Sequence, residues 1–168
     1  MTGYRKQRNL KNYLIKTKVP PQQKRESRDL KGMTKCKKSC ATCPYVKEGT
    51  KIKINNRENW IINKKVNCET YNCVYLIECQ KDNCKARYIG QTKRKFKDRI
   101  NDHRSYISNQ VESTPTGAHF NLPGHSLADL KVLILEQTKY NDELYRKIRE
   151  EYLINKFNTF NKGLNREK

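Results

Sequence analysis

The 168-residue sequence has no apolar run long enough to cross a bilayer. Its N-terminal stretch, MTGYRKQRNLKNYLIKTKV, has no apolar core of the kind found in a signal peptide. No long amphipathic basic helix is evident either, which argues against a membrane surface as the partner. We therefore expect an intracellular protein in a reducing compartment, with no membrane partner.

Acidic residues are few compared with basic ones. The chain has 17 Asp and Glu residues against 37 Lys and Arg residues, which gives a formal net charge of +20. A field of this sign attracts polyanions, so nucleic acid is the expected partner. The alternative is a surface charged only for solubility, but evenly mixed charge would serve that purpose.

Cysteine is abundant, with seven residues, an odd number. In a reducing compartment, clustered cysteines bind metal more often than they form disulfides. Cys36, Cys40 and Cys43 are close enough in sequence to chelate one ion, and Cys68 is the best-placed fourth ligand. These residues predict a four-thiolate zinc site. The alternative is a set of free thiols in a loop.

A second set of zinc ligands combines two cysteines with two histidines. Cys79 and Cys84 bracket one loop, and His119 and His125 lie in a later loop, each pair at a spacing that one ion can bridge. The gap between the pairs is 34 residues, far longer than in a DNA-reading zinc finger. We therefore expect a structural zinc that pins the histidine loop onto a hairpin. Each histidine taken alone would be an ordinary surface or core residue.

Composition divides the chain into three parts: a basic N-terminal arm or linker at 1–31, a cysteine-rich zinc-binding segment at 32–72, and a compact domain at 73–168. The arm has ten basic and two acidic side chains and little apolar material to bury. It is suited to lie along a phosphate backbone or to tether a preceding domain. Within the second part, apolar residues at 51–54 and 60–62 predict a small β-hairpin that turns at Asn55-Asn56.

The third part begins with two strands and a helix. Residues 73–79 and 86–90 are apolar enough for core strands and close enough to pair antiparallel, and Gly90 is expected to allow a tight turn. A helix is predicted from Lys95 to about Ser108. Its apolar stripe comprises Phe96, Ile100, His103 and Ile107. Four basic residues on or near it are predicted to face solvent and to contact DNA: Lys93, Arg94, Lys97 and Arg104.

A third strand, predicted to be the most buried, covers 130–136. Asn141 or Asp142 can cap a last helix at 143–157, which is expected to pack Leu144, Ile148 and Tyr152. The order is β-β-α-β-α with short connections. We therefore predict an α+β fold: a small antiparallel three-stranded sheet flanked by helices, with zinc-binding insertions.

Phosphodiester cleavage needs an activated water, a Lewis acid at the phosphate and cationic stabilisation of the added charge. Two phenols on neighbouring strands, Tyr75 and Tyr88, can face one site. Arg99 suits phosphate oxygens, and His103, one helical turn further, can accept a proton. Glu150 can hold Mg²⁺ or Mn²⁺. The alternatives are plain strand tyrosines, a solvated arginine, and a glutamate paired with Arg146 or Lys147.

These residues resemble the GIY-YIG nuclease family. Val74-Tyr75 and Tyr88-Ile89-Gly90 stand where the family has its two half-motifs, with Cys73 in place of the usual glycine. The helix residues Arg99 and His103 and the closing Glu150 and Gly163-Leu164-Asn165 complete the pattern. The resemblance implies a metal-dependent DNA endonuclease in which Tyr75 or Tyr88 activates water, His103 assists and Arg99 holds the phosphate. It further implies Glu150 as the metal ligand, with its neighbour Glu151 as the alternative, and Asn165 as a residue that orders the site.

The chain is most similar to the endonuclease domain of Penelope-like retroelements. The two-Cys, two-His set, the HRS at 103–105, the AHFNLPGHS at 118–126 and the upstream cysteines all look like that branch. The similarity implies a nuclear enzyme that nicks target DNA to prime reverse transcription, with a reverse transcriptase domain or the element RNA as partner. The chain has no adjacent Asp-Asp pair of the polymerase type. The alternatives are a non-catalytic, zinc-containing nucleic-acid-binding module and a structure-specific repair nuclease.

Overall fold

The computed structural model describes residues 31–139 and 142–166. The prediction of a basic arm falls almost entirely outside these residues, as does the candidate cap Asn141. Within the described part, no helix combines the length and apolarity needed to cross a membrane.

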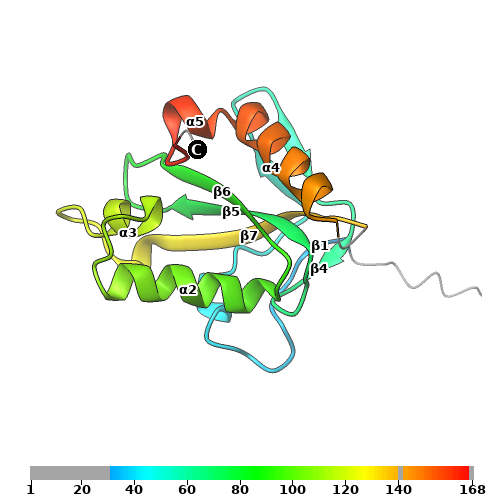
Figure 1. The fold of residues 1–168 in the computed structure, drawn as a ribbon, viewed down its shortest axis with the longest axis horizontal. Coiled ribbons are helices and arrows are strands. Elements are labelled where there is room, and N and C mark those ends of the chain that lie inside the picture. Colours follow the sequence, from blue (N-terminus) through cyan, green and yellow to red (C-terminus); the bar gives the residue numbers. More distant parts are fainter. Residues whose placement is uncertain (1–30, 140–141, 167–168) are drawn as a thin grey trace, which may run out of the picture.

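A three-stranded antiparallel sheet forms the centre of the structure (Figure 1). β5 (Cys73–Cys79) lies in the middle, with β6 (Arg87–Thr92) on one side and β7 (Leu130–Gln137) on the other. The predicted α+β class is therefore confirmed. The expectation that the third strand is the most buried is wrong, because every residue of β5 is buried. A central strand pairs with a full strand at both edges, whereas β7 pairs with β5 on one side and has only an isolated bridge between Val132 and Val46 on the other.

Helix α2 (Phe96–Ser108) lies along the sheet and buries the predicted stripe of Phe96, Ile100, His103 and Ile107. No side chain caps its first turn. Instead, the backbone N–H groups of Phe96 and Lys97 donate to the carbonyls of Thr70 and Cys68, at 2.7 and 3.0 Å. The cysteine-rich segment therefore satisfies donors that the start of a helix leaves free.

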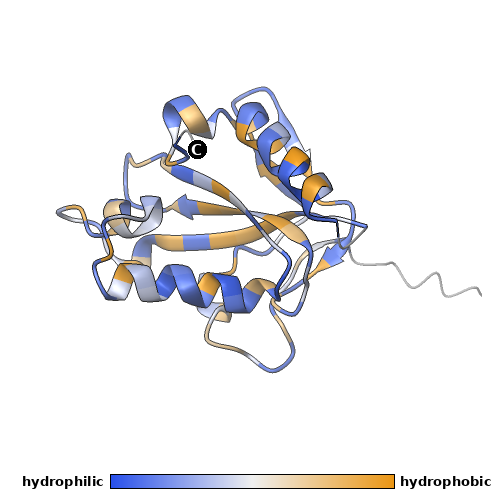
Figure 2. Cartoon of the chain, in the orientation of Figure 1, coloured by the Kyte–Doolittle hydropathy of each residue, from blue (hydrophilic) through white to orange (hydrophobic). Residues whose placement is uncertain are grey.

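Helix α4 (Glu143–Phe157) runs beside β6 and begins at Asp142, whose carboxylate accepts from the N–H groups of Leu144 and Tyr145. The predicted packing of Leu144, Ile148 and Tyr152 is wrong, since all three are exposed. The buried residues of this helix are Arg146, Glu150, Leu153 and Phe157. Figure 2 shows apolar and polar residues mixed along α4, whereas β5 and β7 are mostly apolar. Two sets of residues in this helix have helical spacing. The set that begins with Arg146 and Glu150 faces inward, and the set that begins with Leu144 and Ile148 faces solvent.

The cysteine-rich segment forms short strands: β1 (Gly32–Met33) pairs with β4 (Lys65–Val66), and β2 (Lys51–Lys53) pairs with β3 (Asn59–Ile61). The predicted hairpin is confirmed, and Asn55 stabilises its turn by accepting from the N–H groups of Arg57 and Glu58. Trp60 Nε1 donates to the carbonyl of Leu135 in β7 at 2.9 Å. Residues of this segment and of the sheet belong to one continuous hydrophobic core. The predicted boundary between the cysteine-rich segment at 32–72 and the domain at 73–168 stays a prediction.

The remaining elements are short. A 3₁₀ turn, η1 (Cys43–Tyr45), lies among the upstream cysteines, and α5 (Thr159–Lys162) follows α4. The loop between α2 and β7 contains α3 (Pro115–Phe120) and η2 (Leu127–Asp129), so it is more regular than its Thr, Pro and Gly content indicates. Thr114 explains α3, because its hydroxyl accepts from the N–H of Gly117 in the first turn.

Candidate active site and metal centres

Gly90 is the residue that makes room for the site. It lies within β6, directly opposite Tyr75 of β5. A Cβ atom at this position would lie 2.5 Å from the phenol oxygen of Tyr75. The predicted tight turn at Gly90 is therefore wrong. The missing side chain instead allows the Tyr75 ring to lie across the neighbouring strand.

The Tyr75 phenol is the centre of a buried hydrogen-bond chain. Arg99 Nε donates to its oxygen at 3.0 Å, and His103 Nε2 lies 2.8 Å from the same oxygen. His103 Nδ1 lies 2.9 Å from the hydroxyl oxygen of Thr116. Because Tyr75 already accepts from Arg99, its own proton points to His103 Nε2. His103 is then the neutral tautomer with its proton on Nδ1, directed at Thr116.

Burial sets the protonation states of this chain. Tyr75 is completely buried, and desolvation raises its pKa far above the usual value. Desolvation also lowers the pKa of His103 to about 3, with a further contribution from the positive charge of Arg99. His103 is therefore neutral near pH 7 and carries no charge that would repel Arg99.

Tyr88 lies two residues from Gly90 on β6, so it points to the same face of the sheet as Tyr75. The His103 ring contacts both phenols, with centroid distances of 5.7 Å to Tyr75 and 5.5 Å to Tyr88. Burial raises the pKa of Tyr88, the positive charge of Arg99 opposes this rise, and the negative charge of Glu150 adds to it. Tyr88 therefore lies close enough to Arg99 and to Glu150 for the charge of each to affect its pKa.

Glu150 reaches the site from α4. It is 8% exposed, whereas the neighbouring Glu151 is exposed to solvent. Tyr88, Glu150 and Asn165 line one cavity of about 610 Å³. A largely buried carboxylate at such a cavity fits a divalent cation, because Mg²⁺ is typically held by one or two carboxylates while waters and substrate phosphate supply its remaining oxygens.

Asn165 acts on the edge of the sheet. Its Oδ1 accepts from the N–H of Ile89 at 2.9 Å, and its Nδ2 donates to the carbonyl of Ile89 at 2.8 Å. The carboxamide thus pairs with β6 as a further strand would. Because Ile89 lies between Tyr88 and Gly90, this contact holds the backbone that carries Tyr88.

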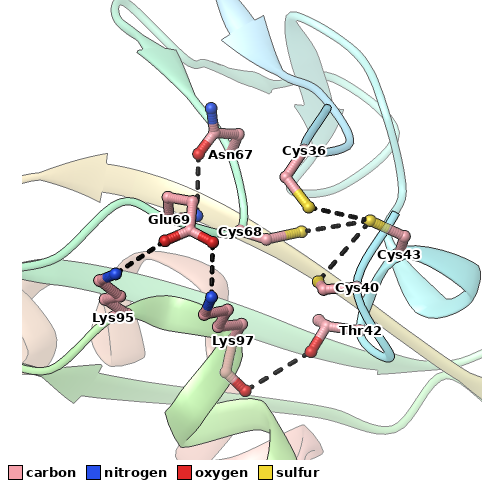
Figure 3. Close-up of polar contacts among 9 residues, drawn as sticks. All are labelled: Cys36, Cys40, Thr42, Cys43, Asn67, Cys68, Glu69, Lys95 and Lys97. Carbon is pink, nitrogen blue, oxygen red and sulfur yellow. Dashed lines mark hydrogen bonds and ion pairs between the residues drawn. The ribbon is translucent and has the colours of Figure 1, made fainter. Parts of the chain in front are cut away.

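The upstream cysteines converge as predicted (Figure 3). Cys43 Sγ lies 3.4 Å from Cys36 Sγ, 3.7 Å from Cys40 Sγ and 3.7 Å from Cys68 Sγ. A tetrahedral zinc with bonds of about 2.3 Å requires sulfur atoms about 3.8 Å apart. Hydrogen bonds with the Cys40 backbone and the Cys43 side chain lower the pKa of Cys36 to about 7, which favours its thiolate. Burial raises the pKa of Cys43 and Cys68, so these two thiols need the positive charge of a bound metal to ionise. The residues therefore fit a zinc ion.

The second ligand set also converges. One donor atom from each of Cys79, Cys84, His119 and His125 lies within 4.8 Å of all the others. Cys84 Sγ is 3.5 Å from His119 Nε2, the separation expected of sulfur and nitrogen on one tetrahedral zinc, about 3.5 Å. His125 Nε2 is buried and has no hydrogen-bond partner among the described residues. Such an atom fits a metal ligand, and zinc at this position would join the β5–β6 loop to α3.

The four residues predicted to contact DNA separate into two groups. Lys93 and Arg94 lie beside Arg99, lining a smaller cavity with it. Lys97 instead forms an ion pair with Glu69 at 2.5 Å, which Figure 3 shows together with Lys95. The guanidinium of Arg104 lies over the Tyr45 ring at 5.1 Å. Lys97 and Arg104 are half-buried against the cysteine-rich segment, so they are available to solvent only in part. That all four residues contact DNA stays a prediction.

Two residues of the site were not predicted from the sequence. Thr116 accepts from His103, and no sequence signal points to it. Arg146 is 2% exposed on the inner face of α4, one turn before Glu150, and this four-residue spacing is a signal that could have identified it. The seventh cysteine, Cys73, belongs to neither metal set. Its burial raises its pKa to about 12, as expected of an unreactive core thiol.

A family model, the GIY-YIG catalytic domain, matches residues 71–165, which is more than half of the chain. The match covers the sheet, α2, α4 and Asn165. Comparison with curated proteins finds no significant match, and neither does comparison with solved structures. A GIY-YIG domain implies a nuclease, GIY-YIG nucleases are metal-dependent, and a nuclease domain implies DNA as the substrate. The chain belongs to the GIY-YIG nuclease family.

Proposed function

We propose that this protein is a DNA endonuclease that hydrolyses a phosphodiester bond in one strand and depends on Mg²⁺ or Mn²⁺. One observation carries the proposal: Tyr88 lines a single cavity with Glu150, and its ring lies 5.5 Å from the ring of His103, which shares the Tyr75 oxygen with Arg99. Tyr88, Arg99 and Glu150 come from β6, α2 and α4. A base, a cation for phosphate and a metal-binding carboxylate are the three groups that the reaction needs.

Each residue has a distinct part in the proposed reaction. Tyr88 first loses its own proton to solvent in the cavity that it lines with Glu150, and its phenolate then accepts the proton of the attacking water. Arg99 stabilises the phenolate and the charge that develops on the phosphate. Tyr75, His103 and Thr116 hold Arg99 in place through the Nε hydrogen bond. A Mg²⁺ or Mn²⁺ ion bound by Glu150 would supply a Lewis acid at the phosphate.

We further propose that the nick serves a retroelement of the Penelope-like type. The convergence of the two-Cys, two-His set and of the four upstream cysteines supports this, because these insertions carry the resemblance. The 3′-hydroxyl released by the nick would prime a reverse transcriptase that copies the element RNA. Such a reaction on chromosomal DNA belongs in the nucleus.

Plasmid nicking tests the enzyme directly. Supercoiled plasmid with Mg²⁺ should become open-circular with the wild-type protein, and Glu150→Gln should slow this by roughly 100-fold or more because the metal ligand is lost. Glu151→Gln tests the alternative ligand, which is exposed but lines the same cavity. It should cleave normally, and a loss as large as that of Glu150→Gln would assign the metal to Glu151 as well.

Other outcomes separate the alternatives. A wild-type protein that binds DNA but never cuts it would be a zinc-containing binding module. Strong preference for branched over linear duplex would favour a repair nuclease. Extension of the nicked strand by an added polymerase would show the 3′-hydroxyl that priming requires.

A further inference from the structure

Arg146 of α4 is a buried cation that forms no ion pair with a carboxylate of the described residues. Its Nε donates to Gln91 Oε1 at 3.1 Å, and its Nη1 donates to Asn72 Oδ1 and to the Asp142 carbonyl, both at 3.2 Å. All three acceptors are neutral. Among residues 31–139 and 142–166, no ion pair involves Arg146, although its exposed fraction is only 2%. Arginines this buried are ordinarily paired with an anion.

The residues that line the cavity beside Arg146 are mostly positively charged or neutral. It has a volume of about 250 Å³ and is lined by Gln91, Thr92, Lys93, Arg94, Arg99, Glu143 and Arg146. Glu143 is the one acid in this lining, and it pairs with Lys147 at 2.8 Å. Arg94 and Arg99 both contact Asp102, which lies outside the lining. Among the described residues, Lys93 and Arg146 therefore form no ion pair, although both lie close enough to Glu143 to help lower its pKa.

The hydrogen-bond donors and positive charge of Arg146 fit a phosphate group. Arg146 Nη2 makes no hydrogen bond with the described residues, so part of its guanidinium is left for a ligand oxygen. Arg99 belongs both to this cavity and to the Tyr75 contact, which places the cavity next to the reacting groups. A DNA strand bound at Arg99 would therefore lie at the cavity that Arg146 also lines.

We propose that Arg146 and Lys93 form a phosphate-binding subsite, adjacent to Arg99, that holds the DNA backbone beside the phosphate being cleaved. This inference rests on the proposed DNA endonuclease function. The competing interpretation is that Arg146 only attaches α4 to β5 and β6 through Asn72 and Gln91.

Asn72→Asp distinguishes the two interpretations. The change is nearly isosteric and places a carboxylate 3.2 Å from Arg146 Nη1, so it neutralises the arginine without removing its packing. Asn72 does not line the cavity. If Arg146 is only a structural link, the melting temperature should hold or rise and DNA binding should not change. Asn63→Asp, at an exposed position that lines a different cavity, controls for the added negative charge.

Binding is measured by fluorescence anisotropy with a short duplex over a range of NaCl concentrations. Divalent ions are omitted, and so is any chelator, because chelation would remove zinc. Asn72→Asp and Arg146→Gln should each weaken binding about tenfold and lower the slope of log Kd against log salt by about one. Asn63→Asp should stay within about twofold of the wild type. Wild-type affinity and slope in a folded Asn72→Asp protein would overturn the subsite.

Two further readouts keep the test decisive. If either variant fails to fold, the wild-type protein is titrated with duplexes that carry one neutral methylphosphonate at successive positions. A loss of about tenfold at a phosphate flanking the cut supports the subsite, and no loss at any flanking position refutes it. Binding is measured independently of cleavage. If the wild-type protein never nicks DNA but Asn72→Asp still weakens DNA binding, the nuclease proposal is refuted and the subsite is not.

Discussion

The two phenols of the site differ in what their oxygens can reach. Tyr75 is fully buried, and its oxygen is engaged by both Arg99 and His103. Tyr88 borders the larger cavity together with Glu150. A general base must lie close to the proton that it removes. Because Tyr88 borders the cavity and the Tyr75 oxygen is buried, we assign Tyr88 as the base and Tyr75 as a residue that supports Arg99.

Substituting each tyrosine by phenylalanine tests these assignments. Tyr88→Phe removes the proton acceptor and should lower the single-turnover cleavage rate by roughly 100- to 10,000-fold with DNA affinity retained. Tyr75→Phe removes the hydrogen bonds of the phenol with Arg99 and His103, which only support the site, and should lower the rate by only about tenfold. A larger loss with Tyr75→Phe than with Tyr88→Phe would reverse the two assignments.

At the scale of elements, β6 is an edge strand that other segments hold in place. On one side it pairs with β5, and on the other the Asn165 carboxamide pairs with Ile89. The chain at Gly163 approaches so closely that a Cβ there would lie 2.5 Å from the Arg87 carbonyl. Tyr88 is thus held by its strand as well as by its own contacts.

Gly90→Ala should disturb this strand and the site together. The new methyl group would overlap the Tyr75 hydroxyl, so the ring must move and its contacts with Arg99 and His103 weaken. We expect a loss of about 1–3 kcal/mol in the free energy of unfolding, measured by urea denaturation, and a larger relative loss of nicking.

The control for this change is Ile89→Val, on the same strand but the opposite face. It should cost about 0.5–1.5 kcal/mol and leave nicking close to the wild-type rate. Unchanged nicking by a folded Gly90→Ala protein would contradict the close approach of Tyr75 to β6.

At the scale of the whole molecule, the zinc-binding segments and the nuclease fold are interdependent. Cys68 contributes to the four-cysteine cluster, and its carbonyl accepts from the first turn of α2. The same helix carries Arg99 and His103. A metal at the four-cysteine site would therefore act at a distance on the candidate active site, through the position of α2.

Zinc content and stability test this coupling. The wild-type protein should contain two zinc ions per chain, and Cys68→Ser should contain one, as measured by elemental analysis. Cys68→Ser should also lower the melting temperature and slow nicking in excess Mg²⁺, because α2 loses its support. Cys73→Ser, outside both sets, should keep both ions, and a wild-type protein without zinc would refute both centres.

The sequence by itself determined the features that depend on local pattern. Helical spacing identified the buried stripe of α2, turn residues identified the β2–β3 hairpin, and cysteine and histidine spacing identified two ligand sets that do converge. These features could be predicted because period, turn chemistry and chelate size depend on residues close together in the chain.

Only the tertiary structure decided which face of α4 is inward, why residue 90 is glycine, and which side chains surround Arg146. Leu144 and Ile148 have the same helical period as Arg146 and Glu150, so periodicity alone favours the apolar pair. The role of Gly90 depends on the Tyr75 ring from another strand. The burial of Arg146 against two neutral side chains of the described chain depends on Asn72 and Gln91. Contacts between residues distant in sequence arise from packing, which local pattern does not encode.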